Sequence, residues 1–150
     1  MKSLRFAAIL ASFLPLLASA NDIDGKWKAS FIGPRDNLPR MVKEMVFDLK
    51  VEGDKLTGTA HMGSWPGDAP ISDGKVDGNQ ITFTAIGKSP WRAGAQGSYS
   101  SGYPRLKFIG TVQGNEIKLT GAWDSIVIYG KVGTDPTTFQ MEAKRLLESQ

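Results

Sequence analysis

The chain contains no cysteine and a single histidine among its 150 residues. The absence of cysteine excludes a disulfide scaffold, an iron–sulfur protein and a zinc site built on thiolates. With only one imidazole, a zinc site would have to consist mostly of carboxylates, which is unusual. We therefore expect no metal and no cofactor, and a fold that is stabilised by packing and hydrogen bonding.

The sequence also lacks a long apolar run and a large excess of one charge. Its longest apolar run covers thirteen residues, 6–18, whereas about twenty are needed to cross a bilayer. Residues 1–20 carry Lys2 and Arg5 but no acid, so the rest holds 16 of the 18 basic residues against all 15 acidic ones, a net charge of +1. We therefore expect no transmembrane anchor and no nucleic-acid partner. The oligomeric state is left open.

The apolar run near the amino terminus matches a targeting segment. Basic residues precede it, and Ala18-Ser19-Ala20 provides the small-residue pattern that a signal peptidase recognises. This pattern predicts a secretory signal peptide over residues 1–20, cleaved before Asn21, and a single domain over residues 21–150. The mature protein is then expected to be exported, to the periplasm or to the extracellular space.

The common catalytic motifs are absent. The chain has no Gly-x-Ser-x-Gly elbow, no Walker loop, no Gly-x-Gly-x-x-Gly and no His-Glu-x-x-His sequence. Asp22-Ile23-Asp24-Gly25 resembles the start of a calcium loop, but the remaining ligands do not follow at the required spacing. Turn formation explains this segment better than calcium binding.

Beyond residue 21, apolar residues recur at every second position rather than at helical spacing. Trp27, Ala29 and Phe31 alternate with polar residues, and the same period returns along the rest of the chain. One apolar and one polar face is typical of strands in an antiparallel sheet or a small barrel. The pattern predicts nine strands, at 25–31, 40–51, 55–62, 71–77, 80–87, 105–112, 116–123, 126–132 and 137–145.

A short repeat predicts how several of these strands are connected. Residues 51–57, 76–82 and 112–118 share one template, in which a valine ends a strand and a Gly-Asp or Gly-Asn pair reverses the chain. Glycine at the first central position favours a type II′ turn. The template therefore predicts three tight hairpins, and Gly133-Thr134-Asp135-Pro136 predicts a fourth, looser turn.

The order of tight and long connections predicts the architecture. In an up-and-down meander the four turns lie at one end, and the connections 32–39, 63–70, 88–104 and 124–125 lie at the other. We expect an all-β fold, an up-and-down antiparallel meander closing into an 8–9-stranded barrel, because closure removes exposed strand edges. A two-sheet sandwich is the alternative, although sandwiches favour Greek-key connections.

Two short motifs resemble known β-barrel families. Gly25-Lys26-Trp27 resembles the Gly-x-Trp signature of lipocalins, and Leu56-Thr57-Gly58-Thr59 is similar to the corresponding stretch of avidin-type barrels. Lipocalins commonly pack a late basic residue over that tryptophan, and the resemblance implies this role for Arg145. The lipocalin Thr-Asp-Tyr motif is missing, and the avidin set of biotin-contacting residues has no clear counterpart, so a biotin function is not carried over. The resemblance implies a calycin-like barrel that holds a small ligand.

Aromatic and charged residues gather at the expected open end, where the long connections lie. Aromatic faces with a few convergent polar groups are typical of small-molecule sites, and they also suit sugar rings. The alternative is that the aromatic residues cap the core and anchor the loops. The predicted ligand-binding residues are Trp65, Trp91, Tyr99, Tyr103, Trp123, Arg92 and Arg105.

Three further residues at this end are candidates for acid–base chemistry. His61, expected to face outward, is a candidate general base or a plain exposed residue, and Asp68 with Asp124 could act as a glycosidic carboxylate pair. Residues 94–102 are small and polar, and they indicate a flexible part of the longest loop that could serve as a lid. Small inward residues such as Gly110 and Gly121 leave either a cavity or room for the barrel taper.

The pattern favours a binding protein over an enzyme. We expect an exported barrel that takes an apolar or carbohydrate-like small molecule or glycan at its open end. One alternative is a cavity-based isomerase, cyclase or hydrolase on the same barrel. Another is an envelope protein whose loop aromatic residues bind a partner.

Overall fold

The computed structural model describes residues 22–33, 44–63, 67–88, 91–95, 98–129 and 137–147. The predicted signal peptide and the predicted ligand-binding residue Trp65 lie outside these ranges. At 91–95, 98–101, 125–129 and 137 the description concerns the backbone and its pairing only.

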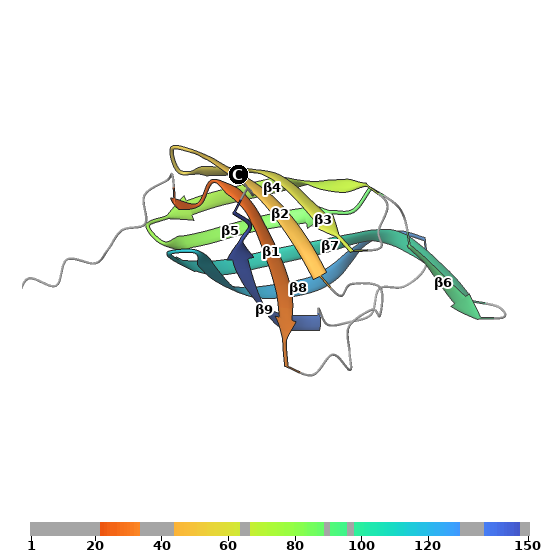
Figure 1. The fold of residues 1–150 in the computed structure, drawn as a ribbon. Helices are drawn as coiled ribbons and strands as arrows, with labels where there is room; N and C mark the ends of the chain where they lie inside the picture. Colours follow the sequence, from red (N-terminus) through yellow and green to blue (C-terminus); the bar gives the residue numbers. More distant parts are fainter. Residues whose placement is uncertain are drawn as a thin grey trace, which may run out of the picture.

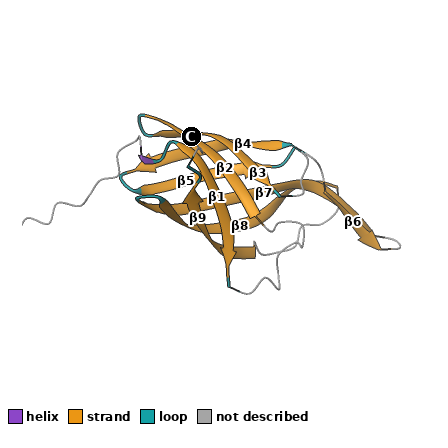
Figure 2. Cartoon of the chain, viewed as in Figure 1, coloured by secondary structure: helices purple, strands orange, loops and turns teal. Residues whose placement is uncertain are grey.

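Nine strands account for most of the described residues (Figure 1), and Figure 2 shows how far strand dominates the fold. They pair antiparallel throughout. The strands are β1 Gly25–Ile32, β2 Glu44–Glu52, β3 Lys55–Met62, β4 Asp68–Asp77, β5 Gln80–Ile86, β6 Trp91–Ala95, β7 Ser98–Gln113, β8 Glu116–Tyr129 and β9 Thr137–Arg145.

Eight of these strands close into a barrel. The sheet order runs β5-β4-β3-β2-β1-β9-β8-β7-β6, and an additional pairing of β5 with β7 closes the circle. Strand β6 stays outside this circle because it pairs with β7 beyond the end of β5. The predicted all-β antiparallel meander, closed into a barrel, is therefore confirmed.

Three two-residue turns lie together at one end of the barrel, on the left in Figure 1. They connect β2 to β3, β4 to β5 and β7 to β8. Their first residues, Gly53, Gly78 and Gly114, have φ values of 66°, 59° and 60°. Among the described residues that follow these glycines none has a positive φ, which is the type II′ pattern. We call this end of the barrel the tight end and the opposite end the wide end.

The structure corrects the predicted break at 124–125. Strand β8 runs without interruption from Glu116 to Tyr129, so the separate strand expected at 126–132 does not exist. Asp124 and Ser125 are polar, and therefore resemble a turn in the sequence, but they pair in register with Arg105 and Pro104 of β7. Since β8 ends beyond the wide end, the connection to β9 starts there. The expectation that it lies with the tight turns is wrong, and residues 130–136 lie outside the described ranges.

The structure also corrects the predicted loop at 88–104. Residues 91–95 form β6, which pairs with residues 98–102 of β7, so the segment expected to be a flexible lid is largely a β-hairpin. On its other side, residues 101–105 of β7 pair with the end of β8. These segments, 91–95 of β6, 98–104 of β7 and 125–129 of β8, form a three-stranded arm that extends beyond the wide end, on the right in Figure 1.

Five phenylalanine side chains pack against one another within the barrel core. Phe83 and Phe108 stack with ring centroids 4.9 Å apart, and Phe47 meets both rings edge-on at 5.4 and 5.3 Å. Phe139 continues the cluster, 6.0 Å from Phe108 and 5.3 Å from Phe31. Such edge-to-face and offset contacts are the favoured geometry of packed rings.

The small inward residues make room for these neighbours. A Cβ atom on Gly121 would lie 2.2 Å from the Phe139 ring, and one on Gly110 would lie 2.6 Å from Leu119 Cδ2. Both distances are too short for real contacts, so these two glycines accommodate large side chains rather than line a cavity. The sequence left open whether these small residues line a cavity or make room within the barrel. At these two positions they make room for neighbouring side chains.

Arg145 and Trp27 close the tight end. The guanidinium carbon of Arg145 lies 4.3 Å from the centre of the fully buried Trp27 ring. The same guanidinium donates to the backbone oxygens of Asp22 and Asp24 and to Asn115 Oδ1. The carboxylate of Asp24 accepts a 2.7 Å hydrogen bond from the amide of Val51. The Asp22–Gly25 segment therefore serves the fold, as the turn interpretation expects.

Candidate functional site

The described core is apolar, so it offers few hydrogen-bonding groups that could orient a ligand. Within the described residues, Thr84 is the one polar or charged member of the buried set. A ligand in the middle of the barrel would meet the packed phenylalanine rings and few hydrogen-bonding groups. Polar groups that can orient a ligand lie instead at the wide end.

Arg105 and Asp124 form an ion pair at the base of the arm. They are direct partners across β7 and β8, and the neighbouring residues Leu106 and Trp123 face the core. Arg105 Nη2 and Nε donate to Asp124 Oδ2 over 2.5 and 3.2 Å, and the side chains are 33% and 26% exposed. Because both donors converge on one oxygen, Asp124 Oδ1 lies outside this pair. Charge-assisted pairs of this kind hold their groups in a fixed direction.

His61 and Asp68 form a second pair at the wide end. They are direct partners across β3 and β4, and His61 Nδ1 lies 2.9 Å from Asp68 Oδ1. Both side chains face outward and are more than half exposed. A carboxylate on Nδ1 orients an imidazole and leaves Nε2 to solvent, which is the arrangement that a general base needs.

The register brings several predicted ligand-binding residues to one face of the arm. Alternation along β7 places positions 99, 101, 103 and 105 on the same face, which continues the outer surface of the barrel. Arg92 and Tyr129 are both partners of Ser101, and Ile126 is the partner of Tyr103. The register of β7 and β8 shifts between Ser101 and Gly102, so that Tyr129 rather than Ile128 lies opposite Ser101. We call this the outer arm face, defined by positions Arg92, Tyr99, Tyr103, Arg105, Asp124, Ile126 and Tyr129.

The two predicted tryptophans of the described ranges lie on the opposite face. Trp91 is the partner of Gly102, which alternates with Tyr103, and Trp123 is partly buried against the core. The structure therefore places the predicted ligand-binding residues on two different faces. Tyr99, Tyr103, Arg92 and Arg105 share the outer arm face, whereas Trp91 and Trp123 share the inner one. Tyr129 was missed by the sequence analysis because the predicted break at 124–125 separated it from this set.

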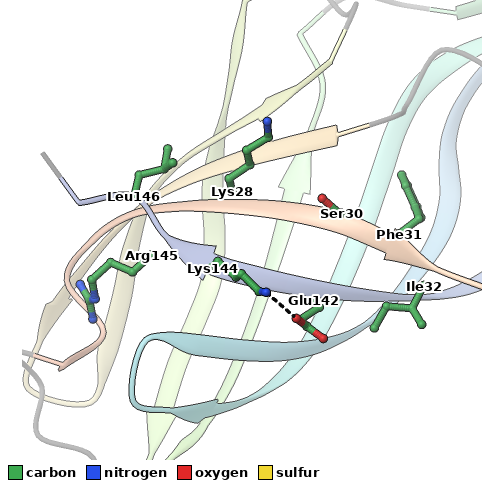
Figure 3. A pocket seen from close by; sticks show the side chains of 8 residues that line it. All are labelled: Lys28, Ser30, Phe31, Ile32, Glu142, Lys144, Arg145 and Leu146. Carbon is green, nitrogen blue, oxygen red and sulfur yellow. Dashed lines mark ion pairs between the residues drawn. The ribbon is translucent and has the colours of Figure 1, made fainter. Parts of the chain in front are cut away.

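A shallow groove lies on the outer surface between β1 and β9 (Figure 3). It has a volume of about 410 Å³, with Ser30 between Lys28 and Ile32 along β1. Its remaining lining residues are Phe31, Glu142, Lys144, Arg145 and Leu146.

Three of the four charged residues that line this groove take part in ion pairs, and the fourth, Arg145, donates to neutral oxygens. Lys28 lies 3.2 Å from Glu44, and Lys144 lies 3.5 Å from Glu142. The pKa of Glu142 is held below its ordinary value, first by a hydrogen bond with Glu116 and then by the nearby Lys144 and Lys118. An acid that stays ionised is a poor proton donor near neutral pH, so the groove offers less chemistry than the wide end.

Two features are absent from the described ranges. No group of three or more histidine, aspartate or glutamate side chains is placed to hold a metal ion there. No helix in the same part of the chain has the length and hydropathy needed to cross a membrane. Comparison with known proteins is also negative, since no protein family, no curated protein and no solved structure matches the chain.

Proposed function

We propose that this protein is an exported binding protein that takes a carbohydrate-like ligand at the wide end of its barrel. The observation that carries the proposal is the gathering of paired charges and aromatic positions at this end, while the tight end is closed by Arg145 over Trp27. Sugars need flat apolar surface for their C–H faces and fixed donors and acceptors for their hydroxyl groups. The outer arm face combines tyrosine positions with the Arg105–Asp124 pair.

The packed interior favours a carbohydrate-like ligand over an apolar one. An apolar ligand would need a cavity in the core, where five phenylalanine rings pack against one another. A ligand at the rim or on the arm stays partly in water, where burial of apolar surface contributes less. Binding at this end then depends on directed hydrogen bonds, which suits a hydroxyl-rich molecule.

We also propose that the barrel is calycin-like. The packing of Arg145 on Trp27, with Trp27 in the Gly25-Lys26-Trp27 signature, is the contact that the lipocalin resemblance implies. Together with the closed eight-stranded meander it supports this assignment. Export rests on the sequence pattern of residues 1–20.

A hydrolase or isomerase remains the second candidate, and the His61–Asp68 geometry is the observation that favours it. The pair lies on the outer wall and not inside the barrel, so a substrate would have to bind across β3 and β4. Turnover that persists unchanged in both His61→Gln and Asp68→Asn would remove this candidate.

Titration of intrinsic tryptophan fluorescence with glycan panels tests the binding function. We expect saturable binding that weakens about tenfold in Arg105→Gln, because an Asp124 carboxylate without its partner no longer holds its direction. Lys107→Gln is the matched control, since Lys107 is the next outward residue on β7 and is exposed. A flat response across the panels, or equal losses in the two variants, would contradict the proposal.

A further inference from the structure

The outer arm face has the layout of a platform, and its members with described side chains, Tyr103, Arg105 and Asp124, are partly exposed. Its positions come from three adjacent strands, and the arm continues past the last residue of β5. No described strand forms a second layer over it. Platforms of this kind differ from pockets, because a ligand can extend beyond both ends of the contact surface.

The tyrosine positions on this face follow one another along a diagonal that crosses the β7–β8 register shift between Ser101 and Gly102. Tyr99 and Tyr103 are four residues apart on β7, a separation of about 13 Å at the rise of a strand. Tyr129 is the partner of Ser101, midway between them, on a strand about 4.8 Å away. Successive tyrosine positions are therefore about 8 Å apart along a diagonal across the arm.

The arm is also nearly free of charge. Its three segments, 91–95, 98–104 and 125–129, contain Arg92 as their single charged residue. At the base of the face, the charge of Arg105 is compensated by Asp124. Such a surface offers little to a polyanion, which needs uncompensated positive charge. It suits a neutral ligand that stacks on rings and exchanges hydrogen bonds.

From this spacing and charge we infer that the outer arm face binds an elongated neutral glycan, several sugar units long, rather than a single sugar. The inference rests on the proposed carbohydrate-binding function and specifies its ligand class. In this proposal each tyrosine position contacts a different sugar unit of the glycan. The Arg105–Asp124 pair fixes the end of the glycan nearest the barrel. Affinity then increases with chain length until all positions are occupied, because each stacked unit adds its own contribution.

Calorimetric titration of the full mature protein with chitohexaose, cellohexaose and laminarihexaose, each beside its disaccharide, tests this inference. We expect at least one hexasaccharide to bind ten times or more tightly than its disaccharide. Tyr99→Ala and Tyr129→Ala should each weaken hexasaccharide binding about three- to tenfold, the range expected for one lost ring contact. Their effect on the disaccharide should be smaller.

Two controls separate ring contacts from unfolding. Ile109→Ala removes an apolar residue that is 61% exposed on the barrel wall of the same strand, and it should leave binding unchanged. Tyr103→Phe keeps the ring and should retain most of the affinity. Circular dichroism of every variant checks the fold. Equal affinity for a disaccharide and its hexasaccharide overturns the elongated ligand but leaves the binding function standing. No binding of any of the six glycans at millimolar concentration overturns both.

Discussion

The two ends of the barrel are built from different kinds of interaction. At the tight end, two-residue turns join the strands, and Arg145 lies on a tryptophan that has no exposed surface. At the wide end, the ion pairs are partly or mostly exposed, and three strands continue past the rim as the arm. The comparison suggests a division of roles. The tight end and the core stabilise the fold, whereas the wide end carries the paired charges and aromatic positions of the proposed site.

Replacement of a tryptophan at each end gives the largest expected contrast. Trp27→Ala should lower the free energy of unfolding by about 3–5 kcal/mol, because a fully buried ring and its hydrogen bond to Ile23 are lost. Trp123→Ala should cost about 1–2 kcal/mol, since Trp123 is only partly buried. Urea unfolding followed by circular dichroism measures both. Equal losses would contradict the division of roles.

A glycine in the core tests whether the interior is filled. Gly121→Ala should destabilise the protein by about 1–3 kcal/mol, because the new methyl group would overlap the Phe139 ring. Ala122→Ser, at the next position on the outer surface, is the control and should be nearly neutral. A neutral or stabilising Gly121→Ala would indicate unfilled space beside Phe139, and with it a cavity that an apolar ligand could occupy.

The same substitution, arginine to lysine, can be made at each end to compare how much each guanidinium contributes to stability. Arg145→Lys should lose about 1–2 kcal/mol, since a lysine cannot reproduce the donors that reach Asp22, Asp24 and Asn115 together. Arg105→Lys should lose at most about 1 kcal/mol, because the Arg105–Asp124 pair is partly exposed. Thermal and urea unfolding of the two variants measure the difference. A larger loss at Arg105 would assign the wide end a structural role.

The smallest effect is expected for the exposed pair. His61→Gln and Asp68→Asn should each change the free energy of unfolding by less than about 0.5 kcal/mol, because both side chains are more than half exposed. Urea unfolding of the two variants and of the double variant provides the test. A loss above about 1 kcal/mol would show that the pair anchors the β3–β4 connection.

Much of the fold could be predicted from the sequence because its signals are local. The two-residue period identifies the inward face, and the Gly-Asp and Gly-Asn pairs fix three turns through the positive φ of their glycines. The lipocalin resemblance implied the contact of Arg145 with Trp27, which the structure confirms. These features depend on a few neighbouring residues or on a short motif.

The arm could not be predicted because its segments lack the local signals that mark the barrel strands. Asp124-Ser125 resembles a turn until Arg105, 19 residues away, is placed opposite Asp124. Residues 94–102 form part of a short β6–β7 hairpin, but their small and polar residues show no apolar alternation and therefore resemble a flexible loop. The predicted site lacked Tyr129 for the same reason. Alternation shows which residues share a face of a strand, but only after the strand itself has been recognised.

A heteronuclear NMR titration of the uniformly labelled protein with chitohexaose, cellohexaose or laminarihexaose tests the central claim most directly. The account predicts that backbone amides of β6, of residues 98–105 in β7 and of residues 124–129 in β8 shift on binding, while those of the turns at 53–54, 78–79 and 114–115 do not. Shifts that centre on the tight end or on the β1–β9 groove would contradict it, as would an unchanged spectrum with all three glycans.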